Sequence, residues 1–249
     1  MKEYDRIILR LFEVLYAQHG DVGVLAFTKD EMEQVADELG IVIKNVPDIL
    51  YTYRSGRSPL PDEILARGEW ALRGAGKGSY EFVRLTRSPH VQIPDDIEIT
   101  PILDATPQIV LKYQSADEQA LLARLRFNRL VDIFTGLTAY HLQGHFRTTV
   151  SGLGQVEIDD LYIGVNENGQ GFLLPLEAKS DTPKDQLGVI QITQMVLLAR
   201  EHFRDLPVRP IGVKAMPDGS LVFLEFNAVE EANDMRTRQI KRYRLYREF

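Results

Sequence analysis

The spacing of hydrophobic residues in the first third of the chain predicts a small helical unit that ends in a β-hairpin. Residues 4–18 place apolar side chains three and four positions apart, as on one stripe of a helix. The sequence TKDE at 28–31 is a capping box that should begin a second helix ending near Gly40. A third helix is expected over 46–54, and two short strand-like runs then flank the turn RGAGKG.

The rest of the chain predicts an α/β domain behind a linker. Residues 86–117 hold four prolines and many acids, which is typical of an extended connection. Beyond it we expect an amphipathic helix over 117–135, a second helical or strand stretch up to 150, and a hairpin over 157–181. A helix over 186–203, strands over 210–216 and 221–226, and a basic helix from about 233 should follow. The expected division is 1–88, a linker over 89–116, and 117–249.

Three helices followed by a hairpin with a basic turn resemble a winged helix-turn-helix module. In such modules the third helix enters a DNA groove and the hairpin touches phosphates. The resemblance implies contacts with double-stranded DNA from Tyr51, Tyr53, Arg54, Arg57, Arg73 and Lys77. The alternative is a helical subdomain whose turn only faces solvent. The turn is not a phosphate-binding P-loop, because Gly78 follows Lys77 and Ala71 stands where the first glycine belongs.

The net charge of the chain weakens the expectation of DNA binding, but the local distribution of charge still allows it. The net charge of −7 opposes phosphate binding, yet residues 51–90 hold 7 basic and 4 acidic groups, and 236–249 hold 6 and 1. A carboxylate cluster that binds a cation would itself lower the total. The absence of cysteine excludes disulfides and Cys-based zinc sites. No apolar run is long enough for a membrane helix and the N-terminus does not resemble a secretory signal, so we expect a cytoplasmic protein.

The hairpin between Glu157 and Asp181 carries ionisable groups where strands usually carry Val or Ile. Residues two apart share one face of a strand, so Asp159 lies with Glu157 and Leu161, and Glu177 lies with Pro175 and Lys179. A register that opposes Asp159 and Glu177 places them about 5 Å apart, whereas a slip of one residue brings Asp160 there instead. Two carboxylates so close repel unless a cation separates them, and Mg²⁺ prefers such oxygen ligands.

Asp159 followed by Glu177-Ala178-Lys179 resembles the PD-(D/E)xK nuclease superfamily, over roughly residues 117–226. The resemblance implies a restriction-endonuclease-like fold, a mixed sheet flanked by helices. It implies Mg²⁺, for which Mn²⁺ may substitute, held by Asp159, Glu177 and the Ala178 carbonyl. Lys179 would assist the attacking water, and Gln191 rather than Gln194 would face the site. Asn128 or Asp132 would add a group from the preceding helix. The sequence departs from the pattern at Ile158, where a proline is usual.

These observations together predict a Mg²⁺-dependent endonuclease that hydrolyses DNA phosphodiester bonds, of the restriction type and homodimeric. The alternatives are a non-catalytic winged-helix regulator and a repair or modified-DNA nuclease of the same superfamily. Two further groups are expected to be structural. Asp117 and Glu118 fit the start of a helix, where the dipole favours acids. His141 and His145 have no acids near them in sequence and are expected to be surface or core residues.

Overall fold

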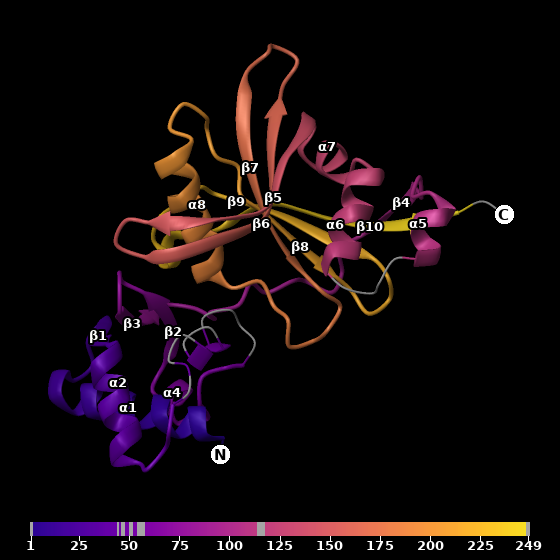
Figure 1. Ribbon diagram of the computed structural model, residues 1–249. Helices are drawn as coiled ribbons and strands as arrows, with labels where there is room; N and C mark the ends of the chain where they lie inside the picture. Colours follow the sequence, from indigo (N-terminus) through magenta and orange to yellow (C-terminus); the bar gives the residue numbers. More distant parts are fainter. Residues whose placement is uncertain are drawn as a thin grey trace.

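Two β-sheets organise the chain in the computed structural model, which describes residues 2–43, 45, 48–49, 52–53, 58–113 and 118–247. Figure 1 shows the smaller sheet with its helices at one end of the molecule and the larger sheet beside it. The smaller sheet is antiparallel and has the order β1-β3-β2. The elements of this N-terminal unit are α1 (Glu3–His19), β1 (Val24–Thr28), α2 (Lys29–Glu38), α4 (Asp62–Leu65), β2 (Glu69–Gly74) and β3 (Ser79–Leu85).

The apolar stripe and the capping box that predict the first two helices are both present in the structure. Helix α1 buries its predicted stripe, including Ile7, Leu11 and Leu15. The capping box of α2 is confirmed, since Thr28 Oγ1 accepts from the Glu31 amide at 3.3 Å and Glu31 accepts from the Thr28 amide at 2.7 Å. The helix expected over 46–54 falls partly outside the described residues; 48–49 and 52–53 are helical.

The second unit is a seven-stranded mixed sheet with helices on both faces. The strand order is β4-β10-β9-β8-β7-β6-β5, with β7–β8 and β4–β10 parallel. Helix α8 packs on one face, and α6 with α7 packs on the other (Figure 1). The elements are β4 (Ile99–Leu103), α5 (Gln108–Tyr113), α6 (Glu118–Phe127), α7 (Leu130–Thr135), β5 (Thr138–Val150), β6 (Gly154–Val165), β7 (Gly171–Lys179), α8 (Val189–His202), β8 (Ile211–Ala215), β9 (Leu221–Phe226), the 3-10 turn η1 (Ala232–Asp234) and β10 (Thr237–Tyr246).

Three sequence expectations for this unit are wrong in detail. Residues 89–116 are not a free linker, because they contain β4 and because the backbones of 89 and 91 bond to those of 189 and 187 at the start of α8. The basic C-terminal segment is strand β10, inserted between β9 and β4, and not a helix. The helix expected over 117–135 is broken into α6 and α7 at Arg129, whose φ of 47° lies outside the helical region.

The two units share a hydrophobic cluster. Ala71, Val83 and Leu85 on the outer face of the small sheet pack in one cluster with Val150 and Val156 of the β5–β6 hairpin. The turn of β2–β3 reaches that hairpin as well, since the Gly76 carbonyl lies 3.7 Å from where a Cβ on Gly154 would stand. The hairpin with the basic turn is therefore held against the second unit.

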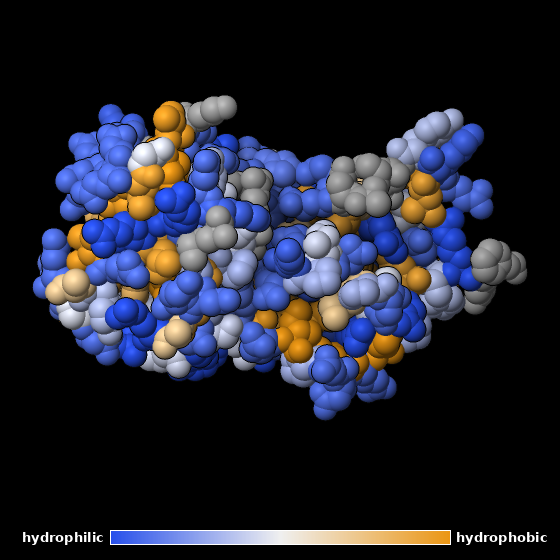
Figure 2. All heavy atoms as spheres, turned by 90° about the horizontal axis from the view of Figure 1, so that it is seen from below, coloured by the Kyte–Doolittle hydropathy of each residue, from blue (hydrophilic) through white to orange (hydrophobic). Residues whose placement is uncertain are grey.

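One face of the molecule is seen to be largely polar (Figure 2). Figure 2 shows hydrophobic residues as separate patches among hydrophilic ones on the face seen from below. None of the helices in the described ranges has both the length and the apolar character that crossing a membrane requires.

Candidate active site

The predicted acids lie where strands β6 and β7 separate. Their paired residues run from Val165–Gly171 to Asp160–Leu176, and β6 then continues beside β5 alone. Asp159 and Glu177 are the next opposed positions in this register. The Ala178 amide donates to Asp159 Oδ2 at 2.8 Å, which holds the carboxylate in the fork. The register that places Asp159 beside Glu177 is therefore the one that the structure adopts.

Glu177, Lys179 and Gln191 form one connected group. Lys179 Nζ lies 2.8 Å from Glu177 Oε1, and Gln191 Nε2 donates to the same oxygen at 2.9 Å. Glu177 and Lys179 are only 4% and 7% exposed. Burial by itself would lower the pKa of Lys179, but attraction by Glu177, Asp159 and Asp185 outweighs burial and raises it. Lys179 is therefore an ammonium ion at neutral pH.

Helix α8 supplies the glutamine, and its first residues are fixed by the preceding segment. Gly188, the N-cap, forms a β-bridge with His90. Gln191 stands three residues further on and points back to Glu177, whereas Gln194 Nε2 is buried with no hydrogen-bond partner. Of the two glutamines considered in the sequence, Gln191 is the one that contacts the acids.

The loop after Lys179 is held by a second buried lysine. Lys214, opposite Lys179 in the β7–β8 register, donates to the carbonyls of Ser180, Thr182 and Asp185, the last two at 2.9 and 2.7 Å. Asp185 in turn accepts from the Ser180 amide at 2.7 Å and places an oxygen 3.8 Å from Lys179 Nζ. The ammonium of Lys214 thus holds the loop after β7 in place. This loop bears Asp185, a carboxylate near Lys179 in addition to Glu177.

Asp160 points to the opposite side and has a structural environment. It is fully buried and accepts from Arg126 Nε at 3.1 Å and Nη2 at 2.6 Å, and from the Tyr162 hydroxyl at 2.6 Å. His141 Nε2 lies 2.7 Å from Asp160 Oδ1, the oxygen that also accepts from Arg126 Nη2. Burial and the neighbouring Asp160 carboxylate raise the pKa of Tyr162, so its hydroxyl remains a donor. Of the two aspartates that the sequence left open, Asp159 is the one that lies beside Glu177.

We expect Asp160→Ala to destabilise the fold strongly, because it strands the Arg126 guanidinium beside a buried cavity. Removing one partner of a buried ion pair typically costs about 3–5 kcal/mol, and partial exposure of Arg126 places the expected loss near the lower end. Urea unfolding of the metal-free protein measures it. A loss below about 1 kcal/mol would contradict the assignment.

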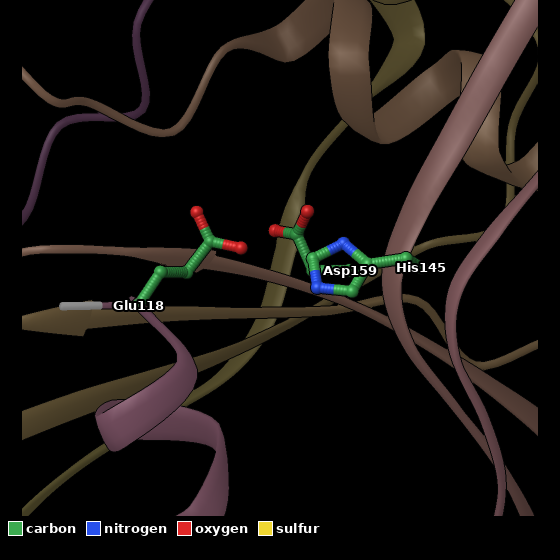
Figure 3. Close-up of side chains that lie close together, drawn as sticks. All are labelled: Glu118, His145 and Asp159. Atoms are coloured by element: carbon green, nitrogen blue, oxygen red, sulfur yellow. The ribbon is translucent and has the colours of Figure 1, made fainter. Parts of the chain in front are cut away.

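Two side chains for which the sequence predicts structural roles, Glu118 and His145, lie near Asp159. Glu118 at the start of α6, His145 of β5 and Asp159 each offer a ligand atom, and the three atoms lie within 4.8 Å of one another. In Figure 3 the Glu118 and Asp159 carboxylates face each other beside the imidazole. Burial, then repulsion by Glu177 and Glu118, raises the pKa of Asp159 well above its usual value. Burial and repulsion by Glu177 raise the pKa of Glu118 as well.

The helix residues suggested by the resemblance do not reach this group. Asn128 Oδ1 accepts from the Ala105 amide at 2.7 Å, and Asp132 accepts from the Ala139 amide at 3.0 Å, so both bind backbone near helix ends. The acid that α6 contributes is Glu118. From the sequence, Glu118 is expected only to interact favourably with the dipole at the start of a helix. The packing of α6 also brings its carboxylate close to Asp159 and His145.

The expected DNA contacts have mixed outcomes. Tyr51, Arg54 and Arg57 lie outside the described residues. Tyr53 is buried and its hydroxyl donates to Asp5 at 2.7 Å, so its expected role in a groove is wrong. Arg73 is ion-paired with Glu81 at 2.9 Å and with Glu231 at 4.0 Å, whereas Lys77 is exposed. Lys77 alone among the described members of this set is an exposed side chain.

Comparisons of the chain with protein-family models, with curated proteins and with solved structures find no match. The chemistry of the group around Asp159 must therefore be argued from its own geometry.

Proposed function

We propose that this chain is a metal-dependent nuclease that hydrolyses DNA phosphodiester bonds. The observation that carries the proposal is the meeting of Asp159 and Glu177 at the β6–β7 fork, with the Lys179 ammonium bonded to Glu177. Glu177 is buried and Asp159 is half-buried, and these two carboxylates with one ammonium nearby leave an excess of negative charge that a divalent cation would neutralise. The proposed cation is Mg²⁺, with Mn²⁺ as a substitute.

The donor set fits such an ion. Asp159 and Glu177 supply hard oxygen atoms, and the third ligand that we propose is the carbonyl of Ala178, the residue whose amide bonds to Asp159. The raised pKa of Asp159 has repulsion from neighbouring carboxylates among its causes, and a cation would relieve that repulsion. When bound, the ion would polarise a phosphate oxygen and lower the pKa of an attacking water.

The chain's own side chains would then orient the substrate. Gln191 holds Glu177 in place, and its other amide atom, Oε1, is buried without a hydrogen-bond partner. Lys179 donates through its ammonium and is positioned to stabilise negative charge on the phosphate in the transition state. Because Lys179 is protonated, we assign it electrostatic stabilisation and orientation of the water, and not proton abstraction.

The proposal includes a winged-helix-like N-terminal module and a restriction-endonuclease-like second domain. Helices and strands in the order α1-β1-α2, then α4-β2-β3, with the sheet order β1-β3-β2, support a winged-helix-like module. A mixed sheet with an acid on one strand, Glu-Ala-Lys on the next and Gln191 on the following helix supports a restriction-endonuclease-like domain. Cleavage of both DNA strands needs two such sites, so we propose a homodimer.

Incubation with supercoiled plasmid tests the function. We expect cleavage by the wild-type chain with Mg²⁺, none with EDTA, and none by Glu177→Gln. Discrete fragments would favour a restriction-type enzyme, and nicking confined to damaged or branched DNA would favour the repair alternative. The opposite result would be a protein that binds DNA and yet cuts no duplex, branched or modified substrate with Mg²⁺ or Mn²⁺. That result would refute the nuclease proposal and favour a non-catalytic DNA-binding regulator.

A further inference from the structure

The group of Glu118, His145 and Asp159 is assembled from three separate elements. His145 lies between Gly144 and Phe146, which pair with Asp160 and Ile158, so it stands across from Asp159 on the neighbouring strand. Glu118 reaches the same point from the first turn of α6. The close-up in Figure 3 places the two carboxylates and the ring around one small volume. This group includes neither Glu177 nor Lys179.

The imidazole has an orienting partner outside the group. His145 Nδ1 lies 3.0 Å from Glu157 Oε1, and the Gln119 amide contacts Nε2. When Nδ1–H donates to Glu157, the lone pair of the neutral ring is on Nε2, the nitrogen that the neutral Gln119 amide reaches. Histidines that bind metals usually donate their other ring nitrogen to a carboxylate, which fixes the tautomer and the ring plane. Glu157 supplies that carboxylate here.

We propose that Glu118, His145 and Asp159 form a second cation site that takes a first-row transition ion such as Mn²⁺ in preference to Mg²⁺. Imidazole favours transition ions, whereas a site of oxygen atoms alone suits Mg²⁺. The site rests on the proposed function only through Asp159, which both ions would share. Its charge also calls for a cation, because the Lys179 ammonium is hydrogen-bonded to Glu177 and not to Glu118 or Asp159.

Mn²⁺ titration of the full chain, followed by electron paramagnetic resonance and calorimetry, tests the site without relying on activity. The wild type should bind two Mn²⁺ ions per chain. His145→Ala should bind one with wild-type affinity and the other at least about 10-fold more weakly, and Mg²⁺ binding at the Glu177 site should be unchanged. His19→Ala, at the exposed end of α1, is the matched control and should bind as the wild type does.

Two further variants, Glu118→Gln and Glu157→Gln, test the same site in case His145→Ala does not fold. Glu118→Gln should weaken binding of the same ion that His145→Ala weakens, and Glu157→Gln should weaken it about 10-fold through the ring orientation. One Mn²⁺ per wild-type chain, or two ions bound with wild-type affinity in both His145→Ala and Glu118→Gln, would overturn the inference even if DNA is cut. Two ions without cleavage of any DNA would instead refute the proposed function and leave this site standing.

Discussion

Lys179→Met should reduce the rate of plasmid cleavage by at least about 100- to 1,000-fold, the usual effect of removing one preorganised donor from a transition state. Methionine keeps most of the apolar stem in its buried position and removes only the ammonium. The loss should appear in the rate at saturating DNA, because the ammonium acts on charge that develops during the reaction. Single-turnover kinetics with excess enzyme measures that rate directly.

The matched control is Lys184→Met, which removes the same charge from an exposed position on the following loop. It should leave the single-turnover rate within about threefold, because an exposed side chain contributes little. Circular dichroism and urea unfolding verify that both variants are folded. A Lys179→Met enzyme that cuts at the wild-type rate would remove Lys179 from the chemistry, whatever the metal ions do.

The central part of the site could be predicted because its signal is local. Alternation along two consecutive strands, with a short turn between them, places Asp159 and Glu177 on opposed positions once the register is fixed. The spacing of Glu177 and Lys179 puts both on one face of β7. What the sequence left open was the register, and the Ala178 amide, bonded to Asp159, identifies the one adopted.

Glu118 and His145 could not be predicted because their neighbours are distant in sequence. His145 meets Asp159 through the β5–β6 pairing, and the acid near its ring, Glu157, comes from the partner strand. Similarly, β4 was hidden in a proline-rich stretch because its pairing partner, β10, lies at the far end of the chain. Long-range strand pairing leaves little trace in a local pattern, and this explains both the missing ligand candidates and the strand mistaken for linker.

The packing between the two units could not be predicted from the sequence either. The basic turn of β2–β3 was predicted to meet phosphates, yet Arg73 pairs with Glu81 and Glu231 and the outer face of the small sheet is buried on the β5–β6 hairpin. The strand-like run of β3 predicts a strand without saying what covers its two faces. A consequence is that any DNA bound by the N-terminal unit would have a fixed orientation relative to Asp159.

Asp159→Asn should abolish cleavage and yet stabilise the metal-free protein by about 1–3 kcal/mol near pH 8, because burial and the neighbouring carboxylates raise the pKa of Asp159 and each pKa unit is worth about 1.4 kcal/mol. Asparagine can still accept from the Ala178 amide but carries no charge for Glu177 and Glu118 to repel. The folded state raises the pKa of Asp159, so its contribution to stability is present below the unfolded pKa near about 4 and is lost as pH rises through the folded value.

Urea unfolding in EDTA between pH 4 and pH 8 measures this difference. The gain of Asp159→Asn over the wild type should grow with pH, and Glu167→Gln, an exposed acid at the opposite end of the same hairpin, should show no such gain. Saturating Mg²⁺ should reverse the order, because only the wild type gains the binding free energy of the ion. A wild type more stable than Asp159→Asn in EDTA at pH 8 would mean that the carboxylate is already compensated by the protein. Such compensation would remove the electrostatic reason for a cation at the fork, because there would be no repulsion between carboxylates for the cation to relieve.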